Sequence, residues 1–332
     1  MSSIRDVAKI AEVSPATVSR VLNGTAKVDP EKRKRVMAAV QQTGFVPNEV
    51  ARSLFKKSAK LIGLIVPGVK NPFFTQLAEY MGNVAEKLGY HVFLSVSGYG
   101  SENILKTLRM LTSMNVDGVV LAVSNREVEQ HLEEIRVPVV AVDCMEKAEH
   151  VAASLYCDYY SGGRMAMQHL IDCGCKKVVC IQGEQNYFSA KMRYQGYRDI
   201  CREQGIEEHV VNCDYDFEAG LAMTEKLLEC YPDADGILSC NDVVAASTFK
   251  NLHKNHIEVP RQIQLVGFDD IRLARLISPE LTTIAQPIYK MAEQAVHCVL
   301  QAQNEEFRMK EPVIFPVELV VRETTKAYLA RR

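Results

Sequence analysis

The chain has 332 residues, of which 47% are hydrophobic, so it is long enough to bury the cores of two or three domains. The formal net charge of −2 is unevenly distributed: residues 1–60 hold 12 Lys or Arg against 5 Asp or Glu, whereas the remaining chain holds 27 against 36. The chain thus has a basic head and an acidic body. This charge asymmetry indicates that the head binds a polyanion.

The sequence lacks the features of membrane and secreted proteins. No apolar run reaches the length of a bilayer-spanning helix, and the opening residues carry acids instead of the apolar stretch of a signal peptide. The ten cysteines form no C-x-x-C pair and no Cys/His arrangement with metal-ligand spacing. We therefore expect a cytoplasmic protein with reduced thiols, no metal, no cofactor and no membrane partner.

Residues 1–46 predict three short helices. Each has an apolar stripe at helical spacing, made of Ile4, Val7, Ala8 and Ala11, then Val18, Val21 and Leu22, then Val36, Ala39 and Val40. Ser3 and Asp6 have the spacing of a capping box, Ser14 caps the second helix, Asp29-Pro30 opens the third and Gly44 ends it. Two short helices with a tight turn and a third that closes the core form a helix-turn-helix domain.

The second helix has a small, polar outer face. Its outward residues are Ser14, Pro15, Ala16, Thr17, Ser19, Arg20 and Asn23. Small residues allow close approach to base edges, while hydroxyls and a guanidinium donate to phosphates and guanine. The alternative is a merely solvated helix, but such a surface normally carries more Glu and Lys.

The stretch IRDVAKIAEVSPATVSRVLNG, followed by GFVPNEVARSL, resembles the DNA-binding head and hinge of the lactose-repressor/galactose-repressor family of bacterial regulators. The resemblance extends over nearly the whole chain and places head contacts to DNA at Ser3 and Ile4 as well as on the second helix. One departure is Glu12, at a turn position where the family often has Gly. A non-Gly residue there costs about 1 kcal/mol if its backbone is left-handed.

Residues 47–60 are expected to form a hinge helix and linker. Asn48 is a predicted N-cap, and the run EVARSL is too brief for a helix that is stable alone. The resemblance implies that two hinge helices pair in a homodimer and enter the minor groove, with Ala51 and Leu54 at the central base step and Arg52 beside them. Without DNA, an exposed flexible linker is the alternative.

Residues 61–332 alternate strands with helices. Continuous Val/Ile/Leu runs follow one another in two series, the first beginning at 61–67 and the second at 176–183, which is typical of parallel sheets covered on both faces. We predict an α/β body of two parallel-sheet subdomains like those of periplasmic binding proteins. The expected bounds are 61–160 with 288–320 for the first subdomain, and 161–287 with 321–332 for the second.

Polar and aromatic side chains follow the predicted strands. They are Asn71, Phe73, Phe74, Asp143, Arg193, Tyr215 or Phe217, Asn241, Asp269 and Gln286. Ligands of open α/β sheets bind at the carboxyl ends of strands. A sugar needs carboxylates and amides for its hydroxyls, a bidentate Arg, and aromatic faces for its C–H surface. Each of these residues alone is more often a turn or capping residue.

This set is similar to that of periplasmic ribose-binding proteins and ribose-type repressors, including the run Asn71-Pro-Phe-Phe74. Cys144 stands where the ribose-type pattern has Arg, so the exact sugar stays open, with ribose as the first candidate. Whether the sugar is an inducer or a co-repressor also stays open. After VELVVRETT only KAYLARR remains, too short for a tetramerising heptad tail, so we expect a homodimer on pseudo-palindromic operator DNA.

Two other classes of function fit the sequence less well. An enzyme is disfavoured because the sequence contains no G-x-G-x-x-G, Walker loop, H-E-x-x-H or G-x-S-x-G motif. A transport-type sugar-binding protein fits the body but would carry a signal peptide and no basic head. Operator binding, tested against turnover of candidate sugars, distinguishes these classes from a sugar-responsive transcription repressor.

Overall fold

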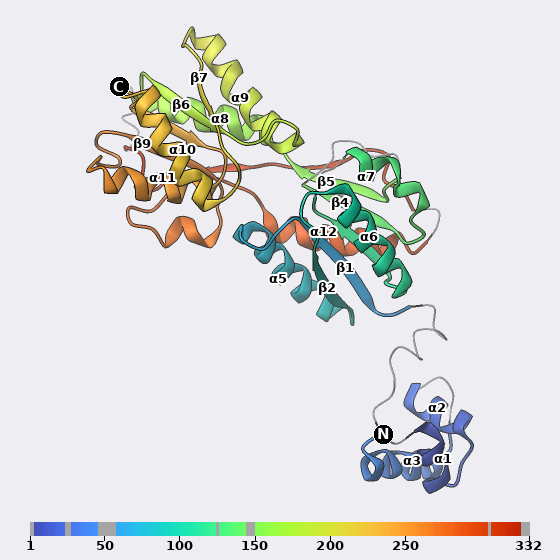
Figure 1. The fold of residues 1–332 in the computed structure, drawn as a ribbon. Helices are drawn as coiled ribbons and strands as arrows, with labels where there is room; N and C mark the ends of the chain where they lie inside the picture. The colour runs from blue at the N-terminus through green and yellow to red at the C-terminus, as the bar shows by residue number, and fades with distance from the viewer. Residues whose placement is uncertain are drawn as a thin grey trace. The chain divides into compact units, whose positions relative to one another are not determined.

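The computed structural model describes residues 3–23, 28–45, 58–123, 126–143, 150–304 and 307–326. The chain divides into two compact units, residues 1–59 and residues 60–332 (Figure 1). The first unit contains the helices α1 (Ile4–Ile10), α2 (Pro15–Asn23) and α3 (Pro30–Thr43). No helix in the described ranges is long and apolar enough to cross a membrane.

The head folds as its capping residues predict. The Ser3 side chain accepts a hydrogen bond from the Asp6 amide, and the Asp6 carboxylate accepts one from the Ser3 amide. Asp29 caps α3, and Gly44 ends it in the left-handed conformation at a φ of 60°. The residues of the three expected stripes form one small core.

Glu12, the departure noted in the turn before α2, has a φ of 50°. The turn therefore holds a non-Gly residue in the left-handed region, at the cost expected from the sequence. The Glu12 carboxylate lies 3.2 Å from the Arg35 guanidinium of α3, although both side chains are well exposed and the pair contributes little.

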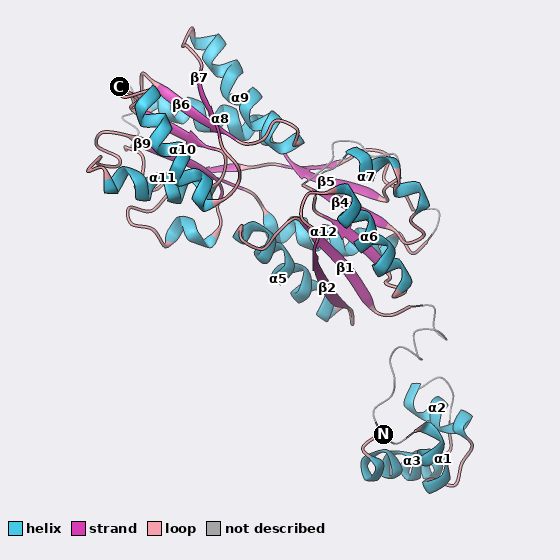
Figure 2. Ribbon diagram, viewed as in Figure 1, coloured by secondary structure: helices cyan, strands magenta, loops and turns pink. Residues whose placement is uncertain are grey.

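The first subdomain of the body is a parallel sheet with the strand order β11-β5-β4-β3-β1-β2 (Figure 2). Its strands are β1 (Leu61–Val66), β2 (His91–Val96), β3 (Gly118–Leu121), β4 (Val139–Val142), β5 (Ala153–Cys157) and β11 (Val313–Phe315). Helices α5 (Pro72–Lys87) and α12 (Ile288–Gln301) cover one face, and α6 (Ser101–Ser113) and α7 (Arg126–Gln130) with the 3-10 turn η1 (Leu132–Glu134) cover the other. Burial on both faces explains the continuous apolar runs.

The second subdomain repeats this plan with the order β12-β10-β9-β8-β6-β7. Its strands are β6 (Val178–Gln182), β7 (His209–Asn212), β8 (Gly236–Ser239), β9 (Gln264–Asp269), β10 (Thr282–Ala285) and β12 (Glu318–Val320). Helices α8 (Tyr159–Asp172) and α9 (Phe188–Gln204) lie on one face, with α10 (Phe217–Cys230) and α11 (Asp242–Lys254) on the other. A 3-10 turn, η2 (Arg272–Arg275), follows β9.

The chain crosses between the subdomains three times. The first two crossings precede α8 and α12, close to the expected boundaries at 160 and 287. The third differs from expectation: residues 318–320 form β12, which pairs antiparallel with β10 and so belongs to the second sheet. A three-residue edge strand carries too little pattern for its sequence to indicate which sheet it joins.

Candidate functional site

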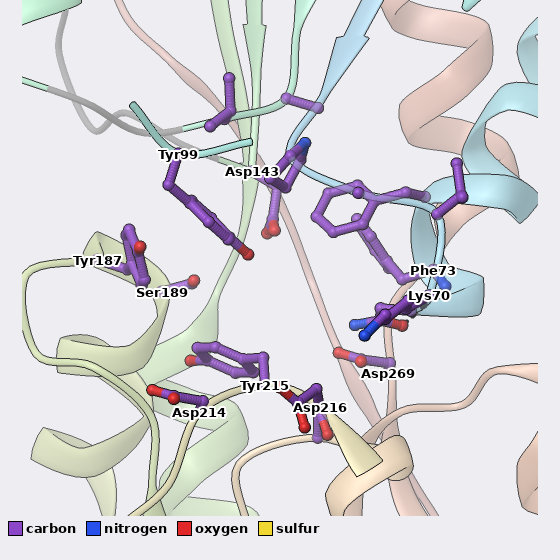
Figure 3. Close-up of a pocket in the computed structure, with 18 of the residues that line it drawn as sticks. Lys70, Phe73, Tyr99, Asp143, Tyr187, Ser189, Asp214, Tyr215, Asp216 and Asp269 are labelled. Atoms are coloured by element: carbon purple, nitrogen blue, oxygen red, sulfur yellow. Dashed lines mark hydrogen bonds between the residues drawn. The ribbon is translucent and has the colours of Figure 1, made fainter. Parts of the chain in front are cut away.

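The carboxyl ends of strands from both sheets surround one cavity of about 670 Å³ (Figure 3). This is where ligands bind in open parallel sheets. Its lining includes nine residues of the predicted set: Asn71, Phe73, Phe74, Asp143, Arg193, Tyr215, Asn241, Asp269 and Gln286. The structure thus gathers residues that are up to 215 positions apart in the sequence around a single space.

Phe217 is the one member of the predicted set that does not line the cavity. It is the first residue of α10, and its ring lies 5.3 Å from the Lys250 ammonium and packs against the core instead. Tyr215 lies two residues earlier, before the N-cap Asp216, and its ring faces the cavity. The loop turns into the helix between these two aromatic residues, so only the first reaches the cavity.

Arg193 is the charged centre of the site. Its guanidinium lies 3.5 Å from the Asp269 carboxylate, donates to the Cys240 carbonyl oxygen at 2.7 Å, and stacks 3.9 Å from the centre of the Phe268 ring. Asp269 also accepts a hydrogen bond of 2.7 Å from the Gln286 amide. These contacts hold both charged groups in fixed orientations inside the protein.

Two glycines allow α9 to carry Arg193 to this position. A Cβ on Gly163 of α8 would overlap the carbonyl oxygen of Arg193, and a Cβ on Gly196 of α9 would overlap that of Tyr160. The helices therefore touch backbone to backbone. Gly163 of the run Tyr160-Ser-Gly-Gly163 therefore serves the close packing of α8 and α9.

Two of the cleft carboxylates, one half-buried and one buried, come from equivalent places in the two sheets. Asp143 follows β4 and Asp269 ends β9, and each has a positive φ, of 60° and 120° respectively. Burial, together with the nearby Asp269, raises the pKa of Asp143 to about 7 against the opposing effect of Arg193. Burial also raises the pKa of Asp269 to about 6, although Arg193 and Gln286 favour its ionised form. Backbone strain and desolvated charge concentrated in one cavity are typical of a binding site.

We expect Asp143→Asn to stabilise the body at alkaline pH. A carboxyl pKa raised from 3.8 to about 7 means that folding stability is complete below pH 4 and is lost as pH rises through 7. That loss is about 4 kcal/mol, and an asparagine avoids it while tolerating the positive φ. Urea unfolding at pH 5 and pH 8 measures the effect, with the exposed Asp172→Asn as control. An equal stability difference at both pH values would contradict the assignment.

Several polar atoms around the cavity are buried without a hydrogen-bond partner among the described residues. They are Tyr215 Oη, Asn241 Nδ2, Gln286 Oε1 and Arg193 Nε. Asn241 uses its other side-chain atom, the oxygen, to cap α11 at 2.8 Å from the Val244 amide. Orphaned buried polar atoms are uncommon in native proteins and need a partner. All four belong to residues that line the cavity, where a polar ligand would bind.

The sequence interpretation missed other lining residues, most of them in loops after strands. They include Lys70, Tyr99, Glu184, Tyr187, Ser189, Asp214 and Asp216. The Tyr99 ring, from the loop after β2 of the first sheet, lies 5.1 Å from the ring of Tyr187, which precedes α9 of the second. Their position after strand ends was a usable signal, but the loop conformation that turns them inward was not visible in the sequence.

The outer face of α2 is accessible. Ser14, Pro15, Ala16 and Arg20 are exposed, and Thr17 and Ser19 are half-buried, while Val18 and Val21 of the opposite face are buried. The Ser14 hydroxyl caps the helix at 3.2 Å from the Thr17 amide. Ser3 is exposed and Ile4 is half-buried at the start of α1. The Asn23 side chain and the hinge residues Asn48, Ala51, Arg52 and Leu54 lie outside the described residues.

A helix-turn-helix head joined to a two-sheet body with a polar cleft defines the class of ligand-controlled DNA-binding regulators. The family model described as "Bacterial regulatory proteins, lacI family" matches residues 3–48, and that described as "Periplasmic binding protein-like domain" matches residues 167–325. The chain is 37% identical to the ribose operon repressor of Halalkalibacterium halodurans, over 98% of both chains. The protein belongs to the lacI family of bacterial regulatory proteins.

Two solved structures are informative neighbours. The lac repressor dimer bound to operator and the anti-inducer ONPF is 26% identical, with a TM-score of 0.89 and coverage of 98% of this chain and 99% of that one. A periplasmic binding protein/LacI transcriptional regulator from Alkaliphilus metalliredigens, complexed with D-xylulofuranose, is 31% identical with a TM-score of 0.73, covering 81% of this chain and all of that one. The predicted regulator fold is confirmed, and the relatives are regulators, not enzymes.

Proposed function

We propose that this protein represses a carbohydrate-utilisation operon and that a small sugar in the cleft, ribose first, controls its affinity for operator DNA. The observation that carries the proposal is the set of unpartnered polar atoms on Arg193, Tyr215, Asn241 and Gln286 around one cavity. A sugar offers several hydroxyls on a small ring, and each hydroxyl both donates and accepts hydrogen bonds.

The remaining lining residues fit the same ligand. The Asp143 and Asp269 carboxylates accept hydrogen bonds from vicinal hydroxyls, and the Phe73 and Phe74 rings, 5.3 Å apart and edge to face, offer apolar surface to a C–H face. The relative at 37% identity is a ribose operon repressor, and the neighbour at 31% identity holds a five-carbon sugar, D-xylulofuranose. Both support a pentose.

The head reads DNA through α2, with Ser14, Pro15, Ala16, Thr17, Ser19, Arg20 and Asn23 as base or phosphate contacts and Ser3 and Ile4 beside them. The hinge residues Asn48, Ala51, Arg52 and Leu54 enter the minor groove, Leu54 as an apolar wedge. Sugar binding changes the relation of the two subdomains, and this change orders or releases the hinge. A two-fold dimer presents two recognition helices, so the operator is a pseudo-palindrome.

The test begins with selection of operator sequences from randomised duplex DNA by the full-length protein. Binding of the selected operator is then measured by fluorescence anisotropy with and without D-ribose. We expect a pseudo-palindromic site and a change of at least tenfold in operator affinity, because allosteric couplings are commonly about 1–3 kcal/mol. Weaker binding identifies an inducer and tighter binding a co-repressor, while no response to any pentose or hexose contradicts the proposal.

Arg20→Ala is expected to weaken operator binding. If Arg20 contacts phosphate, the slope of log affinity against log salt falls by about one, and if it reads guanine, base preference at one position relaxes by about 1–3 kcal/mol. Salt titrations of the selected operator and its point variants separate these cases. Arg35→Ala, which removes the same charge from α3 where it pairs with Glu12, is the control. Operator binding unchanged by Arg20→Ala would remove α2 from the proposed interface.

The homodimer is expected to form through the edge strand β2. Phe93, Leu94 and Val96 are 36%, 38% and 54% exposed there, and an uncovered apolar edge needs a partner. The substitution Val96→Asp places a carboxylate in that contact. It should weaken the dimer by about 3 kcal/mol, which raises the dissociation constant of the dimer roughly 100-fold. Sedimentation velocity at micromolar concentration measures this. The control Ile314→Asp adds the same charge at β11, the opposite edge of the sheet, where the residue is 53% exposed.

A further inference from the structure

The cleft is strongly acidic. The carboxylates that line it belong to Asp143, Glu184, Asp214, Asp216 and Asp269, whereas its only described cationic lining residues are Lys70 and Arg193. Of these carboxylates, Asp269 is buried and Asp143 is half-buried. Glu184 follows β6, and Asp214 and Asp216 follow β7, all in the second subdomain. Figure 3 shows Asp214 and Asp216 beside Tyr215, whose ring centre lies 6.5 Å from that of Tyr187. We call Glu184, Asp214 and Asp216 the acidic rim.

The two cations are poorly placed to neutralise an anionic ligand. Arg193 is already paired with Asp269, bonded to the Cys240 carbonyl oxygen and stacked on Phe268. Lys70 is exposed in the loop after β1, so water screens its charge. Recognition of a phosphate usually relies on an Arg fork or a cluster of cations directed at its oxygens. The described lining offers no such cluster.

The uncapped N-terminus of α9 favours an anion, and the rim opposes it. Helices α5, α10 and α11 also begin at the cavity, but the side chains of Asn71, Asp216 and Asn241 cap them. Helix α9 begins after Tyr187 with no side-chain cap, and a helix N-terminus carries about half a positive charge. Three rim carboxylates outweigh that partial charge. Asp214 is exposed, and the Glu184 carboxylate accepts only from a neighbouring neutral amide, that of Asn186, at 2.7 Å. A phosphate dianion at the cleft mouth therefore meets a net negative field.

We propose that the cleft selects uncharged sugars and rejects their phosphate esters. This inference rests on the proposed function, since it concerns the sugar held in the same cleft. The regulator then senses the free sugar and not its phosphate ester. The acidic rim is the element that sets this preference, while the buried groups bind the sugar hydroxyls.

Calorimetry on the full-length protein tests the selectivity with matched pairs: D-ribose against D-ribose 5-phosphate, and D-xylulose against D-xylulose 5-phosphate. We expect the phosphate ester to bind at least 100-fold more weakly than the free sugar of the pair that binds, with a smaller ratio at high salt. A phosphate ester that binds within tenfold of its free sugar overturns the inference and leaves the proposed function standing. Absence of binding by every sugar, free or phosphorylated, overturns both.

A double variant tests the rim itself. Glu184→Gln with Asp214→Asn removes two negative charges but keeps side-chain size, and Asp216 is left in place because it caps α10 at 2.8 Å from the Ala219 amide. We expect the ratio of free-sugar to phosphate affinity to fall at least tenfold. The matched control, Asp172→Asn with Glu229→Gln, removes two exposed carboxylates that do not line the cleft. An unchanged ratio in the rim variant, or an equal fall in the control, overturns the assignment to the rim.

Discussion

Arg193→Ala is expected to abolish the sugar response while operator binding persists. The substitution removes the only cation buried in the described cleft and leaves the Asp269 carboxylate, 3% exposed, without its ion pair. It also removes the donor to the Cys240 carbonyl oxygen and the unpartnered, buried Nε of a side chain that lines the cleft. Truncating one partner of a buried charge pair costs about 2–5 kcal/mol, so sugar affinity should fall roughly 30- to several-thousand-fold.

Calorimetry with the sugar and anisotropy with the operator measure the two halves of this prediction. Arg202→Ala is the matched control, because Arg202 lies on the same helix with a side chain 62% exposed. Thermal unfolding identifies a variant that has merely lost its fold. Arg193→Lys keeps the charge but not the planar fork, so its sugar affinity should lie between those of the unaltered protein and Arg193→Ala. An Arg193→Ala protein that responds to the sugar with normal affinity would mean that the effector binds elsewhere.

Deletion of residues 1–59 is expected to eliminate specific operator binding and leave sugar affinity within about twofold. The residues of the head core all lie between Ile4 and Phe45, and the cores of the body begin at Leu61, so no described core is shared. The proposed DNA contacts all lie in the deleted segment. Specific recognition is commonly 10³–10⁷ tighter than non-specific binding, and the body keeps a net negative charge.

Anisotropy on the selected operator and calorimetry with the sugar, applied to the full chain and to residues 60–332, provide the comparison. Sedimentation of the truncated protein should still show a dimer, because the proposed β2 contact lies in the body. Retention of specific operator binding by the truncated body would overturn the assignment of the head as the DNA-binding element. Loss of sugar binding in a folded body would show that the two units cooperate in forming the cleft.

The sequence by itself determined the helices of the head and their limits. Ser3, Asp29-Pro30 and Gly44 act through contacts with residues at most a few positions away, so local chemistry is sufficient to place the ends of α1 and α3. The same holds for the buried strands, because a strand covered on both faces must be apolar throughout.

Nine of the ten predicted cleft residues line one cavity. They could be predicted because the position of each one follows from the end of a parallel strand, which the sequence shows as an apolar run. Carboxyl ends of parallel strands meet at one edge, so a polar residue directly after an apolar run is carried to the site whatever its sequence distance. Of the alternatives Tyr215 and Phe217, only Tyr215 lines the cavity, because the two residues flank Asp216 and the start of α10 decides which one turns inward.

Only the tertiary structure decided the features that depend on loops, edges and close approach. Tyr99 and Tyr187 meet across the cleft because loops of two different subdomains converge, and no pattern within either loop encodes that contact. Membership of β12 in the second sheet rests on three residues pairing with β10. The raised pKa of Asp143 likewise arises from burial and from Asp269, more than a hundred positions away. Helix caps and apolar runs depend on residues that are close in the sequence, so the sequence alone predicts them. Desolvation and long-range contacts exist only after the chain has folded.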